Sequence, residues 1–241
     1  MTNKLKYFIG NWKMFGDFGS LKIIYQIHRF YVKFKKRHIV KNKIILCVPS
    51  TLIYFFTKKF KSRFISIGAQ NCHHQKMHGS FTGSLSASML KKVGAKYIIL
   101  GHSENRSEGD TNRLIKQKIK SALDQKLNVI FCIGETITEK KEGKTFSVLK
   151  KQMRDSIDKK YNSNNIFIAY EPIWSIGTGK IPKVQELKKI FKFIKGEFKK
   201  NFKTRSFPTV LYGGSVNDKN IRMFSSISEI DGFLIGGASQ S

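Results

Sequence analysis

The segment 170–180, YEPIWSIGTGK, places a carboxylate directly before a proline and a loop that contains two glycines. Glu171 could be a solvated loop acid, because most carboxylates in folded proteins face water. It could instead be a general base beneath a closing lid, where the exclusion of water raises the pKa of a carboxylate toward neutrality. Both interpretations stay open at this level, because the choice depends on which residues the fold places beside Glu171.

Short apolar runs recur along the chain, and helical periods such as 111–125, 145–159 and 183–200 separate most of them. Strand-like runs that alternate with helices favour a parallel sheet, because parallel neighbours need a crossover connection. Eight such runs predict a single (β/α)8 barrel domain over residues 1–241, with no linker and no second domain. The runs lie at 6–11, 44–49, 64–70, 97–102, 128–135, 166–171, 209–214 and 231–237.

A polar residue or a glycine stands at the end of nearly every run. In a barrel these ends lie on one face, which is where the active site of this architecture is built. Plainer interpretations exist: His102 could be a satisfied, partly buried histidine, Lys13 a surface charge, and Asn11 the end of a strand. The strand-end positions are Asn11, Gln70, His102, Glu135, Glu171, Gly213 and Gly236.

The formal net charge of +29 could indicate binding to nucleic acid or to an anionic membrane. The segment 29–38 interleaves aromatic and basic residues, yet its aromatics continue a helical stripe that predicts a core-facing side and a solvated lysine face. An ordinary basic surface, with no specific nucleic-acid partner, is therefore favoured, and a barrel that acts by binding nucleic acid is the alternative. The two predicted stripes are Ile23, Ile27, Phe30 and Phe34, and Leu187, Ile190, Phe191, Ile194 and Phe198.

The three cysteines are odd in number and form no C-x-x-C pair, which favours a reduced cytoplasmic protein. No segment approaches the roughly 20 apolar residues of a membrane-spanning helix, so no membrane partner is expected. Cys72, His73, His74 and His78 lie close together in the sequence, but their spacing matches no common zinc pattern. No metal is therefore expected.

Short motifs follow one another in a fixed order along the chain. They are GNWKM (10–14), GAQN (68–71), FTG (81–83), GHSE (101–104), CIGE (132–135), YEPIWSIGTGK (170–180), YGGSV (212–216) and IGGAS (235–239). Together they resemble the triosephosphate isomerase family. The resemblance implies cofactor-free interconversion of dihydroxyacetone phosphate and D-glyceraldehyde 3-phosphate through an enediolate, in glycolysis and gluconeogenesis. It also implies a cytoplasmic homodimer.

The resemblance assigns chemistry to particular residues. Glu171 matches the family's base and His102 the neutral imidazole that polarises the substrate carbonyl, a pair that is a standard example of tuned acid–base catalysis. Lys13, with Asn11 as its hydrogen-bond partner, matches the residue that balances the charge of the phosphate and the enediolate. Glu104 would hold Lys13 in place.

The resemblance also implies a phosphate site built from backbone N–H groups in glycine-rich turns. The resemblance also implies a lid in which Pro172 to Trp174 form one hinge and Ile176 to Gly179 the tip. This tip would close over the substrate and be latched near Tyr212. Glu135 has no direct part in the family's chemistry and is interpreted as structural. The residues that match the family's phosphate contacts are Gly177, Ser215, Gly236 and Gly237.

The chain departs from the family at several positions. Ser175 stands where the lid usually has alanine. Ser84 and Asn105 replace a glutamate and an arginine that pair across the family's dimer interface; because both charges are replaced by neutral groups, we expect the dimer to survive. The chain stops at Ser241, where the family continues into a final helix, so we expect a barrel that lacks this helix.

Overall fold

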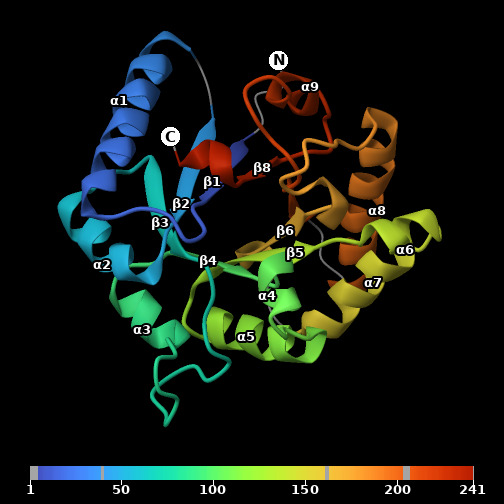
Figure 1. Ribbon diagram of the computed structural model, residues 1–241, viewed down its shortest axis with the longest axis horizontal. Coiled ribbons are helices and arrows are strands. Elements are labelled where there is room, and N and C mark those ends of the chain that lie inside the picture. The colour runs from blue at the N-terminus through green and yellow to red at the C-terminus, as the bar shows by residue number, and fades with distance from the viewer. Residues whose placement is uncertain (1–4, 39–40, 161–162, 203–206, 241) are drawn as a thin grey trace.

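Eight parallel strands form a closed barrel in the computed structural model, which describes residues 5–38, 41–160, 163–202 and 207–240. Each strand pairs with the next one in the chain, and β8 pairs with β1 to close the barrel. Figure 1 looks along the barrel and shows the helices arranged around it. The predicted (β/α)8 fold is confirmed. The strands are β1 Lys6–Asn11, β2 Asn42–Cys47, β3 Ile65–Ala69, β4 Tyr97–Leu100, β5 Asn128–Ile133, β6 Ile166–Tyr170, β7 Thr209–Tyr212 and β8 Gly232–Ile235.

Helices connect the strands, and side-chain caps mark several of their starts. Ser86, Thr111 and Thr136 each accept a hydrogen bond from a backbone N–H of the first turn. Beyond β8 the described residues form only a 3-10 turn, η4, and no α-helix, as expected. No described helix is long and apolar enough to cross a membrane. The helices are α1 Leu21–Arg37, α2 Ser50–Lys59, α3 Ala87–Lys92, α4 Ser103–Ser107, α5 Asn112–Asp124, α6 Ile137–Lys141, α7 Thr145–Ser156, α8 Val184–Phe202 and α9 Ile221–Ser225, with 3-10 turns η1 Phe18–Ser20, η2 Ser163–Asn165, η3 Ile173–Ser175 and η4 Gly237–Ser239.

The core has two layers, because alternate strand residues point into the barrel or outward to the helices. Ile9, Ile130 and Leu211 are fully buried in the inner layer. Ile98 and Phe233 belong to the outer layer, between strands and helices. The stripe predicted on α8 is confirmed, because at most 1% of each of its residues is exposed: Leu187, Ile190, Phe191, Ile194 and Phe198.

The stripe predicted on α1 is wrong at its centre. Phe30 is 69% exposed and stacks on the half-buried Phe34 at the edge of the helix. The buried face is centred instead on Ile24 and Tyr31, and the Tyr31 hydroxyl donates to the carbonyl of Asn42 on β2 at 2.9 Å. Two neighbouring apolar rows run along α1, and packing against the barrel selects the row that contains Ile24 and Tyr31.

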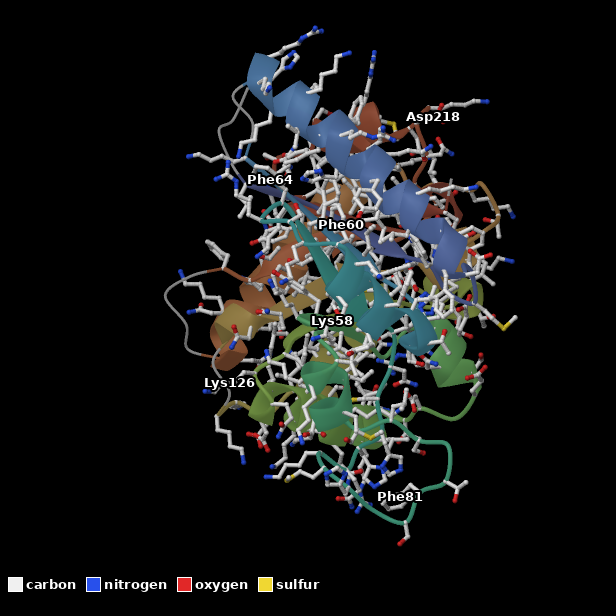
Figure 2. All side chains as sticks on the ribbon, turned by 90° about the vertical axis from the view of Figure 1, so that its left-hand side faces the viewer. Lys58, Phe60, Phe64, Phe81, Lys126 and Asp218 are labelled. Atoms are coloured by element: carbon white, nitrogen blue, oxygen red, sulfur yellow. The ribbon has the colours of Figure 1, made fainter. Side chains whose placement is uncertain are left out.

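The segment 71–86, between β3 and α3, extends away from the barrel in both overall views (Figures 1 and 2). Figure 2 shows Phe81 near its far end. The ring of His73 lies 4.2 Å from the ring of Phe81 and 4.1 Å from that of His74. These aromatic contacts give the projecting segment an internal cluster of its own.

Closure between β8 and β1 depends on a residue without a side chain. A Cβ atom at Gly232 would lie 2.2 Å from the carbonyl oxygen of Tyr7 on the neighbouring strand. The Tyr7 N–H donates to the carbonyl of Asp231 at 3.0 Å, which holds the two strands at this separation. A larger residue at position 232 would therefore force the backbones of β8 and β1 apart.

We expect Gly232→Ala to lower the free energy of unfolding by about 1–3 kcal/mol, because β1 or β8 must shift to admit the methyl group. Gly196→Ala is the matched control: Gly196 lies on the exposed side of α8, where a Cβ would meet no atom within 4 Å. That variant should raise the free energy of unfolding by about 0.5–1 kcal/mol, since alanine is the better helix former. Urea unfolding followed by circular dichroism measures both. Wild-type stability in Gly232→Ala would contradict this explanation of closure.

Candidate active site

Glu171 follows β6 directly and is only 3% exposed. Its backbone N–H donates to the carbonyl of Ile133 on β5 at 2.8 Å, which keeps the residue in line with the strand. On the other side, a Cβ at Gly213 would lie 2.8 Å from Glu171 Cγ, so the glycine after β7 leaves room for the acid. Glu171 is therefore a buried carboxylate at the mouth of the barrel and not a solvated loop acid.

Burial is the largest influence on the Glu171 carboxyl and raises its pKa above the ordinary value of 4.5. His102, a hydrogen bond with the Cys132 side chain, and Lys13 lower the pKa and offset part of this effect. Burial also raises the pKa of Cys132, so this thiol keeps its proton and donates a hydrogen bond to the carboxylate. The result is a desolvated carboxylate that is more basic than a glutamate in water.

His102 is the N-cap residue of α4 and is 5% exposed. Its Nδ1 accepts a hydrogen bond from the backbone N–H of Glu104 at 3.2 Å. Because Nδ1 acts as the acceptor, the single proton of the neutral imidazole is on Nε2. Nε2 lies 3.5 Å from Oε1 of Glu171. A hydrogen-bond donor and a carboxylate therefore face the same small space.

Lys13 has a backbone φ of +54°, in the left-handed region that residues other than glycine seldom adopt. The Asn11 side-chain oxygen accepts the Lys13 N–H at 3.1 Å, and the Gln70 amide donates to the Lys13 carbonyl at 2.9 Å. The Lys13 ammonium lies 2.5 Å from Oε1 of Glu104, as the resemblance implies. These contacts hold a strained backbone and fix the position of one positive charge.

A cavity of about 290 Å³ lies where these residues meet. Its wall combines side chains from the ends of β1, β4 and β6 with the glycine-rich turns that follow β7 and β8. Ile176, in the lid segment, lies at its edge. The structure brings together every site residue predicted from the sequence, because this cavity is lined by Asn11, Lys13, His102, Glu171, Gly177, Ser215, Gly236 and Gly237.

The start of the lid segment is anchored outside this cavity. Oε1 of Glu135 accepts hydrogen bonds from the indole N–H of Trp174 at 2.9 Å and from the Tyr170 hydroxyl at 3.1 Å. The Lys140 ammonium lies 3.8 Å from the centre of the Trp174 ring. Glu135 does not line the cavity, so its contacts agree with a structural interpretation.

Three neighbours of the candidate site receive no chemical role from the sequence. Gln70 and Gly213 stand at strand ends, the signal that places them on the active-site face, but nothing in the sequence assigns a function to them. Cys132 has no such signal, because a thiol inside an apolar strand has the pattern of an ordinary core residue. Its contact with Glu171 becomes visible only when β5 and β6 are placed side by side.

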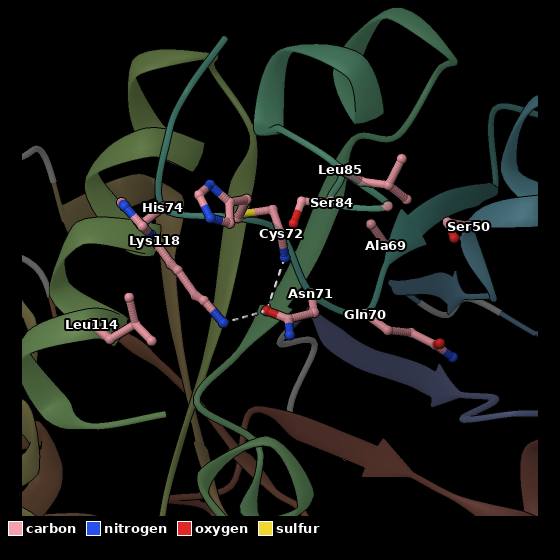
Figure 3. A pocket seen from close by; sticks show the side chains of 12 residues that line it. Ser50, Ala69, Gln70, Asn71, Cys72, His74, Ser84, Leu85, Leu114 and Lys118 are labelled. Carbon is pink, nitrogen blue, oxygen red and sulfur yellow. Dashed lines mark hydrogen bonds between the residues drawn. The ribbon is translucent and has the colours of Figure 1, made fainter. Parts of the chain in front are cut away.

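A larger cavity, of about 550 Å³, lies at the root of the projecting segment 71–86 (Figure 3). In this cavity the Asn71 side-chain oxygen accepts hydrogen bonds from Lys118 Nζ at 3.1 Å and from the Cys72 N–H at 2.9 Å. Lys118 also forms a buried ion pair with Asp110 at 2.7 Å, so its charge is balanced. Within the described parts of the chain, no three His, Cys, Asp or Glu side chains gather to hold a metal ion. The described residues that line this cavity include no aspartate or glutamate, whereas Glu171 lines the smaller one.

Comparison of the sequence with known proteins points to one family. The family model for triosephosphate isomerase matches residues 6–241. A triosephosphate isomerase from Yarrowia lipolytica is 38% identical over 232 residues, which cover 95% of this chain and 92% of that protein. One from Saccharomyces cerevisiae is 37% identical over 234 residues, which cover 95% of this chain and 92% of that protein.

Comparison of the fold gives the same result. The crystal structure of a triosephosphate isomerase from Bartonella henselae matches with a TM-score of 0.86 and 31% sequence identity, covering 98% of this chain and 94% of that one. Sequence and fold thus agree over nearly the whole length, and the buried acid, the imidazole and the lysine lie in one cavity. The chain belongs to the triosephosphate isomerase family of enzymes.

Proposed function

We propose that this enzyme interconverts dihydroxyacetone phosphate and D-glyceraldehyde 3-phosphate through an enediolate, as one barrel domain and without a cofactor. The observation that carries the proposal is the meeting of Glu171, His102 and Lys13 around one small cavity. The reaction needs a base at one carbon, a hydrogen-bond donor at the neighbouring oxygen and positive charge near the phosphate. These three side chains supply those three needs.

Glu171 removes the proton from the carbon next to the carbonyl and returns it to the neighbouring carbon, while a second proton passes from the hydroxyl oxygen of the first carbon to the carbonyl oxygen of the second. Burial raises the pKa of this carboxyl, so the carboxylate is a stronger base than a solvated glutamate. The separation of 3.5 Å between Oε1 of Glu171 and Nε2 of His102 lets the base and the donor act on adjacent atoms of a three-carbon substrate.

His102 and Lys13 stabilise the oxygen on which negative charge develops. The Nε2–H of His102 is available to that oxygen because Nδ1 already accepts from the Glu104 backbone. The Lys13 ammonium lines the same cavity, and Glu104 orients it from one side at 2.5 Å. A fixed donor and a fixed charge in a cavity with little water stabilise the enediolate without reorganisation during the reaction.

The phosphate of the substrate binds to backbone N–H groups of Ser215, Gly236, Gly237 and Gly177, all of which line the cavity. Glycine at such turns lets the main chain approach an anion closely. The net charge of +29 steers a phosphorylated substrate toward the protein. Closure of the lid over the bound substrate excludes water and keeps the enediolate from losing its phosphate.

We further propose that two copies form a homodimer in the cytoplasm. Met14 is fully exposed, and it lines a hollow of about 230 Å³ together with His102 and Asn105. Asn105 is one of the two positions that the resemblance places at the family's dimer interface, so a second copy would bind at this hollow. The projecting segment 71–86 of a second copy, with Phe81 exposed, suits this hollow. The cysteines are free and buried, in keeping with a reducing compartment, and no nucleic-acid or membrane partner is proposed.

Glu171→Asp tests the base and the reaction together. Because the shorter side chain withdraws the carboxylate from the substrate, we expect kcat to fall about 100-fold while KM stays nearly unchanged. The matched control is Glu142→Asp, a solvated residue paired with Lys144 at 2.7 Å, which should keep full activity. A coupled assay of glyceraldehyde 3-phosphate isomerisation measures all three proteins. Equal kcat in Glu171→Asp and wild type would refute Glu171 as the base, and an inactive wild type would refute the function.

The dimer is tested by restoring the two charges that this chain lacks. We expect Ser84→Glu and Asn105→Arg each to weaken the dimer, because a single buried, unpaired charge costs about 3–5 kcal/mol. The double variant should recover much of that loss, since the two charges then pair across the interface. Analytical ultracentrifugation measures the dimer dissociation constant of the wild type, of each single variant and of the double variant. Strictly additive effects would show that the two positions do not meet, and a monomeric wild type at micromolar concentration would contradict the dimer.

A further inference from the structure

The hydroxyl of Ser175 joins three parts of the structure around the lid. Ser175 ends η3 and is fully buried. Its Oγ donates to the carbonyl of Lys180 at 2.5 Å, which ties the beginning of the lid to its end. The same oxygen accepts the backbone N–H of Ser215 at 3.3 Å, in the turn after β7. An alanine, the usual residue of the family here, could make neither side-chain contact.

The packing around Ser175 leaves its hydroxyl little freedom. A Cβ at Gly214 would lie 2.9 Å from Ser175 Oγ and 2.3 Å from the Tyr212 hydroxyl oxygen, so the chain passes very close to both groups. The Tyr212 hydroxyl lies 3.5 Å from Ser175 Oγ. This contact with Tyr212 remains available to the serine if the bond from Ser215 is given up.

The Ser215 N–H is one of the donors that the proposed function assigns to the substrate phosphate. A backbone N–H has one proton to donate, and in this structure that proton points to Ser175 Oγ. A phosphate oxygen is the stronger acceptor, because hydrogen bonds to a charged group are roughly twice as strong as those between neutral groups. Phosphate and Ser175 thus compete for the same donor.

We propose that, without substrate, the Ser175 hydroxyl accepts the hydrogen bond of the Ser215 N–H, and that the phosphate of a substrate displaces it from this donor when it binds. This inference rests on the proposed function, since it uses Ser215 as a phosphate donor. Displacement removes one of the bonds that hold the lid to the turn after β7, and the hydroxyl keeps its contact with Tyr212. Arrival of the phosphate thereby frees the lid from the position that it has without substrate, so that it can close, and Ser175 is a positioning residue that opposes phosphate binding.

The test compares Ser175→Ala with the wild type, using inorganic phosphate as the probe and calorimetry to measure its Kd. Loss of one competing neutral hydrogen bond should lower that Kd about fivefold. Hydrogen exchange at the amides of 176–180 should become faster in the variant without phosphate, because the lid has lost the hydrogen bonds of Ser175 Oγ to Lys180 and Ser215. Ser156→Ala is the matched control: Ser156 is also fully buried, its hydroxyl has no hydrogen-bond partner among the described residues, and its loss should change neither result.

Phosphate affinity that is unchanged or weaker in Ser175→Ala would overturn the inference, as would a wild type that does not bind phosphate. If Ser175→Ala does not fold, Ser175→Cys weakens the same hydrogen bond and must shift the Kd in the same direction, or the inference fails. An enzyme that isomerises triose phosphates but shows no shift contradicts the inference alone. A shift in phosphate affinity without isomerase activity contradicts the proposed function and leaves the competition at Ser215 standing.

Discussion

A buried carboxylate loses the water that would solvate its charge. At the top of this barrel that carboxylate is Glu171, and the residues around it fix its position. The residue continues β6, and its N–H is bonded to Ile133 of β5, so strand pairing itself sets its position. Gly213, after β7, leaves the volume that the side chain occupies. Neighbouring strands therefore hold one charged group in a buried position, where its pKa is raised.

The groups around Glu171 offset part of the free-energy cost of burying its charge, but the pKa of its carboxyl stays raised. Lys13 lowers the pKa of the Glu171 carboxyl, but its ammonium contacts Glu104 at 2.5 Å. A close ion pair between Lys13 and Glu171 would stabilise the carboxylate and make it a weaker base. Glu104 also binds Nδ1 of His102 through its backbone N–H, which leaves Nε2 to donate. One residue thus sets the direction of both the positive charge and the imidazole, and the base stays available to the substrate.

Topology explains why so much of this site can be predicted from the sequence. In a parallel barrel all strands end on the same face, so a polar residue after an apolar run, such as Asn11 or His102, is placed beside the others before any packing is known. The rotation of α1 cannot be predicted in this way, because the rows containing Ile24 and Phe30 fit the helical period equally well. The contacts of Cys132 and Ser175 also depend on which segments the fold brings together, so neither residue type nor spacing reveals them.

Direct titration of the Glu171 carboxyl tests whether the barrel makes this carboxylate basic. Carbon-13 NMR of the free enzyme with labelled glutamate carboxyls, using Glu171→Gln to assign the signal, gives the pKa without interference from the substrate phosphate. We expect a midpoint above the ordinary glutamate value of 4.5, because burial outweighs the neighbouring donors and charges. Since the carboxylate is the active form, catalysis should be lost as the pH falls through that raised pKa. A midpoint at or below 4.5 would contradict the view that desolvation by the barrel prepares Glu171 as the base.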